Sequence, residues 1–179
     1  MTKHFDKQEL IRCYWDEGRC KECKLAQAAM RLPYGIEDNV MALVEDVLEP
    51  VRVRLGKPIV VNSGFRCPLH NRTVGGATVS QHMKGEAVDI TAGSPAKNLE
   101  LARMIVENGE WDQMILYPML TSSTSDATRE SSNKLGSPSQ LARFVHVSYK
   151  RGDVNRREIL RKTSGGYVKL SINPNRSLD

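Results

Sequence analysis

The amino-acid sequence predicts an α+β domain with a small, mostly antiparallel β-sheet and helices packed on one side of it. Apolar residues recur at helical spacing in two long segments, and short runs of β-branched residues lie between and after them. Glycine and proline stand at the junctions of these segments. The resulting order of helix, strand, strand, helix, strand and strand is typical of a domain in which helices and sheet form separate layers.

The first half of the chain predicts one helix and one strand. The helical pattern runs through "NVMALVEDVLEPVRVRLG", after a cap at Asp38 or Asn39. We expect Pro50 to kink this helix or mark its last turns, and Gly56 to end it. The β-branched run "PIVVNSGFR" predicts a buried strand, and "CPLHNRTVGGATVSQHMKG" predicts a long polar loop.

The second half predicts a helix and three more strands. "EAVDITA", "WDQMILYP" and "ARFVHVSY" are interpreted as strands, and "SPAKNLELARMIVENG" as a helix capped by Ser94 and closed by Gly109. In the last strand, alternation puts Phe144, His146 and Ser148 on one face. The polar run "TSSTSDATRESSNKLGSPSQ" predicts an exposed loop. The tail is polar, and one short helix is predicted at "NRREILRK".

Length and composition indicate one soluble domain. A chain of 179 residues can bury a single sizeable core, and 40% hydrophobic with 26% charged residues is ordinary for a globular protein. We expect one domain over residues 1–179, with its core at about 38–150. Residues 1–37 would form a helical N-terminal segment, and 151–179 a C-terminal extension. We expect a monomer.

The charge pattern and the hydropathy exclude several classes of partner. The net charge is +5, but 26 basic residues are dispersed among 21 acidic ones, without a basic run interleaved with aromatics. We therefore expect no nucleic-acid partner. The start "MTKHFDKQELIR" lacks the apolar segment of a signal peptide, so we expect synthesis in the cytoplasm. No apolar run approaches the roughly 18 residues of a membrane span.

Four cysteines leave a second metal site open as an alternative. Without an export signal, disulfides are not expected. Cys20 and Cys23 form a C-x-x-C pair, and Cys13 with Cys67 or His70 would complete a structural zinc site. The other interpretation is free thiols near a helical segment.

The stretch "SQHMKGEAVDI" holds a histidine and an aspartate that suit a metal. His82 lies near the end of a loop, Asp89 lies on the next strand, and His146 lies on a later one. Catalytic zinc takes three protein ligands of such types and leaves one position open. Gly85 would let the chain reverse so that His82 and Asp89 converge. Spacing alone leaves an ordinary loop and strand as the alternative.

These residues also resemble a known family. "SQHMKGEAVDI" is similar to the S-x-H-x-x-G-x-A-x-D motif of the zinc D-Ala-D-Ala carboxypeptidase family of metallopeptidases, which has the Hedgehog/DD-peptidase fold. The likeness extends upstream through "SGFR" and "VGGA", as in phage endolysin-type members, and downstream to "WDQMILY" and "FVHVSY". It covers roughly residues 40–150.

The resemblance implies one Zn²⁺ per chain, with His82, Asp89 and His146 as its ligands. It also implies substrate contacts from Arg66, whose planar guanidinium suits a carboxylate or a peptide carbonyl. Ser80 would donate to substrate or fix the loop. Gln113 would orient a substrate amide.

The general base is the point where the sequence departs from the family. Several branches place an acidic residue or a histidine just before the last ligand, but residues 141–145 here are "LARFV". The remaining candidates are Asp112 and Glu86, and Asp112 is favoured because its strand could run beside that of His146. Glu86 can serve only if its strand begins after it.

The predicted function is a zinc peptidase that hydrolyses a stem-peptide bond of peptidoglycan. Both a D-Ala-D-Ala carboxypeptidase and an endolysin-type endopeptidase fit, and a phage or prophage enzyme would reach the cell wall after release. The missing acid near His146 motivates an alternative, a non-catalytic zinc-binding phage structural protein with the same fold.

Overall fold

A six-stranded mixed sheet forms the centre of the structure, a computed structural model that describes residues 2–11, 35–118 and 142–171. Its strands lie in the order β1-β2-β4-β3-β5-β6. They are β1 (Val60–Ser63), β2 (Ala87–Thr91), β3 (Gln113–Pro118), β4 (Ala142–Ser148), β5 (Glu158–Thr163) and β6 (Gly166–Leu170). All neighbours are antiparallel except β3 and β5, which run parallel. The predicted α+β class with a mostly antiparallel sheet is confirmed.

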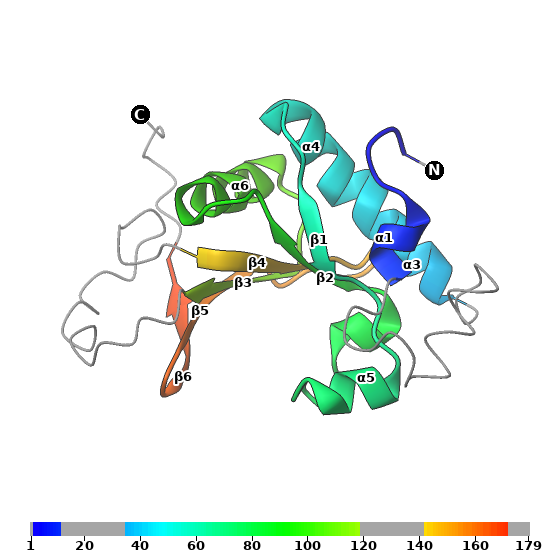
Figure 1. Cartoon of the computed structure of the whole chain (residues 1–179), viewed down its shortest axis with the longest axis vertical. Coiled ribbons are helices and arrows are strands. Elements are labelled where there is room, and N and C mark those ends of the chain that lie inside the picture. Colours follow the sequence, from blue (N-terminus) through cyan, green and yellow to red (C-terminus); the bar gives the residue numbers. More distant parts are fainter. Residues whose placement is uncertain (1, 12–34, 119–141, 172–179) are drawn as a thin grey trace.

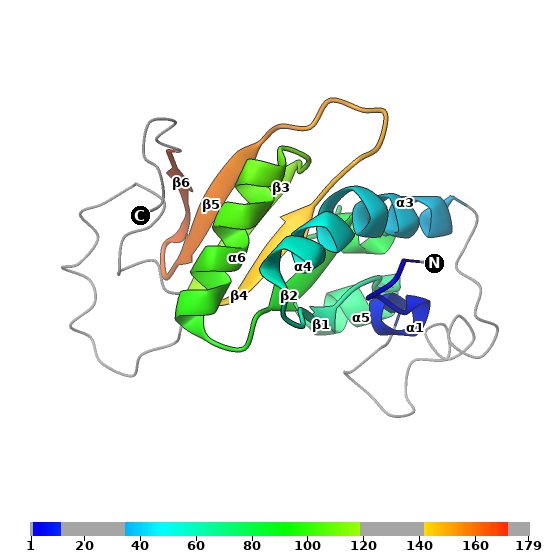
Figure 2. The ribbon, with the colours of Figure 1, turned by 90° about the horizontal axis from the view of Figure 1, so that it is seen from above.

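The longer helices cover one face of this sheet. Figure 1 shows α6 and the α3 to α4 helix on one side of the strands and α5 on the other, and Figure 2 shows α6 and α4 from above the strands. The helices are α1 (Lys7–Ile11), α3 (Ile36–Leu43), η1 (Val44–Leu48), α4 (Glu49–Leu55), α5 (Pro68–Thr73), η2 (Gln81–Lys84) and α6 (Pro95–Asn108). Within the described ranges, each helix is too short or too polar to cross a bilayer.

The two faces of the central strands differ in character because side chains alternate along a strand. On the helix-covered face the side chains are apolar and almost inaccessible. They are Val88, Ile90, Met114, Leu116, Val145 and Val147. Each such side chain stabilises the fold by about 1.5–3 kcal/mol relative to exposure. The intervening residues Asp89, Ile115 and His146 face a cavity on the other side.

The helical run over residues 36–55 is continuous, but its middle part, η1, is a π-helix. Pro50 follows two residues later and has no N–H to donate to the carbonyl of Asp46, four residues back. That carbonyl instead accepts a hydrogen bond from Asn108 Nδ2 of α6, at 2.9 Å. The run therefore tolerates the proline, and it ends as predicted at Gly56, where φ is 65°.

One prediction of irregular structure is wrong because local capping was overlooked at two places. The predicted long loop after β1 contains α5 and η2. Pro68 opens α5, where a missing N–H is harmless, and the Cys67 thiol accepts a hydrogen bond from the His70 N–H at 3.3 Å. Ser80 caps η2 in the same way, since its hydroxyl accepts from the His82 N–H.

The short helix predicted at residues 155–162 is also wrong, because this segment forms β5. Ile159 and Arg161 are buried while their neighbours are less so, which is the period of a strand. The exposed edge of β3 supplies the hydrogen bonds through parallel pairing. Neighbouring β6 closes a hairpin, with Thr163 paired to Gly166.

Several sequence predictions lie partly or wholly outside the described residues. The serine-rich loop falls within 119–141, and most of the helical N-terminal segment falls within 12–34. Of that segment, α1 is helical as expected. The division of the chain into a core and two flanking segments stays a prediction.

Candidate metal centre

Three elements bring His82, Asp89 and His146 together. His82 lies in η2, which ends at Gly85 in a left-handed conformation with φ 73°. A side chain at Gly85 would place its Cβ 2.7 Å from the carbonyl oxygen of Ile36, so only glycine fits this turn. The turn leads into β2, where Asp89 pairs directly with His146 of β4.

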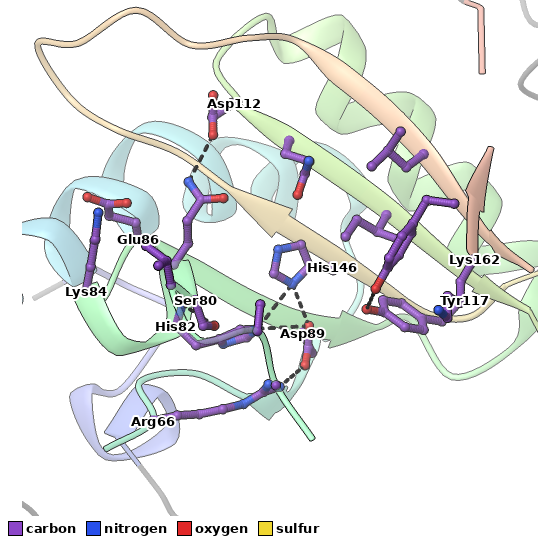
Figure 3. Close-up of a pocket in the computed structure, with 18 of the residues that line it drawn as sticks. Arg66, Ser80, His82, Lys84, Glu86, Asp89, Asp112, Tyr117, His146 and Lys162 are labelled. Carbon is purple, nitrogen blue, oxygen red and sulfur yellow. Dashed lines mark hydrogen bonds and ion pairs between the residues drawn. The ribbon is translucent and has the colours of Figure 1, made fainter. Parts of the chain in front are cut away.

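The three predicted ligands converge through one atom each. His146 Nδ1 lies 2.9 Å from Asp89 Oδ1 and 3.1 Å from His82 Nε2. His82 Nε2 lies 3.3 Å from Asp89 Oδ1. All three residues are buried, and they form the group of ligand-type side chains that stands out among the described residues. Figure 3 shows the three side chains directed toward one another.

These distances fit a tetrahedral zinc ion. Ligand bonds of about 2.0–2.1 Å to nitrogen and oxygen place the ligand atoms of a tetrahedral site about 3.3 Å apart. The three observed separations of 2.9–3.3 Å come close to that value. Three protein ligands would leave the fourth position of such an ion for water or substrate, as in a catalytic site.

A hydrogen bond fixes the imidazole of His82 in the form that binds a metal. Its Nδ1 lies 2.8 Å from the carbonyl oxygen of Gly64, which can only accept, so Nδ1 carries the proton. The lone pair of Nε2 is then free for the metal. Burial lowers the pKa of His82, although the carboxylate of Asp89 acts in the opposite direction, so the imidazole is neutral near pH 7.

Asp89 is an ionised carboxylate whose two oxygens have different partners. Oδ1 faces the two imidazoles, while Oδ2 accepts a hydrogen bond from Arg66 Nη2. Arg66 is fixed in turn by Ser63, whose hydroxyl oxygen accepts from Nε at 2.8 Å. Burial alone would raise the pKa of Asp89, but the two histidines outweigh it and hold this pKa far below its usual range. Arg66 thus orients the carboxylate that faces the metal position.

A cavity of about 780 Å³ opens beside the three ligands, and its walls come from both halves of the chain. Predicted site residues and several residues that the sequence did not single out share this space (Figure 3). Its lining includes Arg66, Ser80, Gln81, Lys84, Glu86, Asp112, Gln113, Tyr117, Phe144, Lys150, Arg156, Leu160, Lys162 and Tyr167.

Asp112 is buried, and both of its oxygens are taken by hydrogen-bond donors. Oδ1 accepts from the backbone N–H of Arg156 at 2.8 Å and from its Nε at 3.0 Å. Oδ2 accepts from Arg156 Nη2 at 2.6 Å and from Gln81 Nε2 at 2.9 Å. Burial opposes its ionisation, but the bonds to Arg156 outweigh it, so the pKa of Asp112 lies far below its usual range. This arrangement does not support Asp112 as a proton acceptor.

Glu86 lies just before the first residue of β2. The strand thus begins after it, as its role as a general base would require. Figure 3 shows its carboxylate beside Lys84, turned away from the three ligands. Gln113 donates to Glu158 Oε2 at 2.8 Å, and Ser80 fixes the loop as the cap of η2. The catalytic and substrate roles of these residues stay predictions.

The sequence reasoning missed the cavity residues of β5 and β6 and the partner of Asp112. Lys162 and Tyr167 could have been found, because "EILRKT" and "GYVKL" alternate on either side of a Ser-Gly turn. Arg156 left no comparable signal, since it lies 44 residues beyond Asp112. Of the cysteines, Cys67 is buried as a helix cap, while Cys13, Cys20 and Cys23 lie outside the described residues.

The fold is an α+β domain in which two histidines and an aspartate, of types that could hold a metal ion, converge at the edge of a cavity. Residues 3–124 match the model of the family described as Peptidase M15, and the chain belongs to that family. The resemblance predicted from the motif is thereby confirmed. The match ends before β4 and β5, so the evidence for His146 comes from the geometry.

A curated relative supports the same family. The zinc D-Ala-D-Ala carboxypeptidase of Streptomyces albus G is 52% identical to this chain over 48 residues, which are 26% of this chain and 19% of that protein. The chain thus spans about a fifth of the length of this relative. That relative is named as a zinc enzyme, and the three candidate ligands of this chain are residue types that suit the same ion.

Proposed function

We propose that this protein is a zinc-dependent peptidase that hydrolyses a peptide bond in the stem peptide of peptidoglycan. The observation behind the proposal is the convergence of His82, Asp89 and His146 beside an open cavity in a chain of the Peptidase M15 family. The relative from Streptomyces albus G is named for action on D-Ala-D-Ala, so a carboxypeptidase or an endopeptidase acting on such peptides is proposed here.

The residues of the site would have different roles in this reaction. His82, Asp89 and His146 would hold the zinc; His82 is oriented by donating to the Gly64 carbonyl and Asp89 by accepting from Arg66. Zinc bound there would act as a Lewis acid that polarises a substrate carbonyl and lowers the pKa of a water molecule. The layer behind the ligands is apolar and buried, so the packed sheet would hold these groups in place for the substrate.

The proton acceptor would be Asp112 or Glu86, and two isosteric variants distinguish these candidates. Asp112 is held by Arg156 and Gln81, whereas Glu86 lines the cavity with its carboxylate beside Lys84. Loss of a general base lowers turnover by roughly 10² to 10⁴-fold. We expect Glu86→Gln to show such a loss if Glu86 accepts the proton, and Asp112→Asn to show it if Asp112 does.

The test of the proposed function is product release by the zinc-loaded protein from defined muropeptides. Release of free D-alanine identifies a carboxypeptidase, and new amino groups without free D-alanine identify an endopeptidase. His82→Ala is the matched control, because contaminating host enzymes would survive this substitution. A zinc-loaded wild type that releases neither product refutes the proposed function.

A second candidate is a non-catalytic zinc-binding structural protein, of phage origin, with the same fold. The observation in its favour is that the carboxylate expected as base, Asp112, is fully engaged by donors. It predicts zinc binding and thermal stabilisation by zinc without any product release.

The biological setting is proposed as lysis of a bacterial cell wall by an endolysin-type enzyme of a phage or prophage. Such an enzyme clears purified peptidoglycan in a turbidity assay. A carboxypeptidase that only trims stem peptides leaves the turbidity unchanged, because it cuts no cross-link.

A further inference from the structure

The hairpin of β5 and β6 extends the face of the sheet on which the metal ligands lie. Its strands are joined by two residues between the pair Thr163 and Gly166, a tight connection that fixes their register. Lys162 and Tyr167 are the next pair, directly opposite each other, and both line the cavity. The hairpin follows residue 124, where the family match ends, so it is a feature of this chain beyond the matched segment.

Unlike most other basic residues of this cavity, Lys162 has no carboxylate partner among the described residues. Arg66, Lys150 and Arg156 each form an ion pair with an aspartate. Lys84 is exposed to solvent. Lys162 is half-buried, and no carboxylate of the described residues lies within ion-pair distance of it.

The ammonium group of Lys162 lies over an aromatic ring instead. Its Nζ is 4.3 Å from the centroid of the Tyr167 ring, a cation–π contact that orients the group and leaves its charge uncompensated. Lys162 and Tyr117 lie on the same side of the metal ligands in Figure 3. The ammonium group is thus held at one end of the cavity.

Two phenol groups complete this end of the cavity. The hydroxyl oxygens of Tyr117 and Tyr167 lie 3.5 Å apart, and the Tyr117 ring stacks on Phe144 with 4.5 Å between centroids. Phenols are protonated at neutral pH, so the pair can offer one hydrogen-bond donor to a ligand while the other hydroxyl donates within the pair. A fixed cation beside a phenol donor is a site for an anionic oxygen.

We propose that Lys162, Tyr117 and Tyr167 bind a carboxylate of the peptide substrate, at one end of the cavity that holds the metal ligands. This inference rests on the proposed peptidase function and names the chemistry that the hairpin recognises. The carboxylate has two sources. It is the C-terminal carboxylate in a carboxypeptidase reaction, or a carboxylate within the stem peptide in an endopeptidase reaction.

The test compares kcat/KM for three peptides: a D-Ala-D-Ala peptide with free carboxylates, its C-terminal amide, and a form whose internal carboxylate is an amide. We expect wild type to lose about tenfold in kcat/KM, mostly in KM, with the amide that removes the recognised carboxylate. Lys162→Gln should lose the same factor on the free acid and should not discriminate against that amide. The sensitive amide identifies the source of the carboxylate.

Three further variants separate recognition from general damage. Lys162→Arg should keep most of the discrimination, and Tyr167→Phe should lose part of it, because the ring remains while the hydroxyl is gone. Lys169→Gln is the matched control, since Lys169 lies on the same hairpin and pairs with Glu158 outside the cavity lining. Equal kcat/KM values for wild type and Lys162→Gln on all three peptides overturn the inference.

Failure of the proposed function gives a different result. In that case wild type releases no product from any peptide, and the same three peptides are then titrated against the zinc-loaded protein by calorimetry. Weaker binding to Lys162→Gln than to wild type supports the carboxylate site. Equal binding by the two proteins refutes it.

Discussion

Two buried aspartates of the sheet region, Asp89 on β2 and Asp112 just before β3, differ in how many of their carboxylate oxygens are held by donors. Asp89 and Asp112 both have a pKa far below the usual range, and both bind an arginine. Arg66 takes only one oxygen of Asp89 and leaves the other facing two imidazoles. Arg156 and Gln81 take both oxygens of Asp112.

The comparison shows that a depressed pKa does not by itself identify a catalytic carboxylate. A carboxylate with one uncommitted oxygen can coordinate a metal, whereas one whose oxygens are all occupied fixes the backbone around it. Asp112 joins the start of β3 to the segment before β5, because it accepts from the Arg156 N–H and its own carbonyl accepts from the Glu158 N–H. The four predictions below test this difference.

The largest effect is expected at the metal ligands. His82→Ala or His146→Ala should reduce bound zinc from about one ion per chain to near zero, because two ligands do not complete a catalytic site. Metal analysis of the purified proteins measures this. His4→Ala is the control. The imidazole of His4 lies 2.7 Å from the Glu49 carboxylate, outside the candidate metal site, so this variant should keep its zinc content. Full zinc content in His82→Ala would contradict the assignment of the ligands.

Asp112→Asn should destabilise the protein by about 2 kcal/mol while leaving zinc binding intact, because it removes the charge of a buried carboxylate that accepts hydrogen bonds from a half-exposed arginine. Denaturant unfolding measures the loss. The pH dependence has a defined sign: the bonds to Arg156 hold the folded-state pKa of Asp112 below that of an exposed aspartate, so its stabilisation is present above about pH 4 and lost as the pH falls. The difference between wild type and the variant should therefore be largest at neutral pH and shrink in acid.

Arg66→Gln should weaken zinc binding by roughly 10- to 100-fold, because it frees the oxygen of Asp89 that Arg66 holds. Competition with a chelator of known affinity measures the change. An unchanged affinity with a raised KM would favour the direct substrate contact that the family resemblance implies.

The smallest effect is expected at Ser80. Ser80→Ala should cost about 1 kcal/mol of stability, because the hydroxyl caps η2 through the N–H of His82. Turnover should change little if the cap is its main role. A large loss of kcat with unchanged stability would instead support donation to the substrate.

Much of the fold was accessible from the sequence where local signals agreed. The strands with His146 and Asp89 and the helix between Ser94 and Gly109 have clear periods and caps. The segment that became β5 was misassigned because "NRREILRK" suits a helix locally, and only pairing with the edge of β3 makes it a strand. Such non-local hydrogen bonding leaves little trace in a short polar segment.

In the site, too, local patterns could be predicted from the sequence and non-local contacts could not. The three ligands were predicted from motif and resemblance, and the geometry brings them together. The engagement of Asp112 could not be predicted, because its partner Arg156 lies in an irregular segment 44 residues away. The cavity end formed by Lys162 and Tyr167 depends on the misassigned hairpin and was missed with it.

Because Asp89 pairs directly with His146, zinc binding by the proposed ligands would depend on the register between β2 and β4. A slip of one residue between β2 and β4 would turn the imidazole of His146 into the apolar core and place Val145 or Val147 against Asp89. Misregistered chains would then be unable to bind zinc, whereas correctly paired chains gain its binding free energy as folding free energy. Zinc should therefore select the native alignment of the sheet during folding, in addition to any role in turnover.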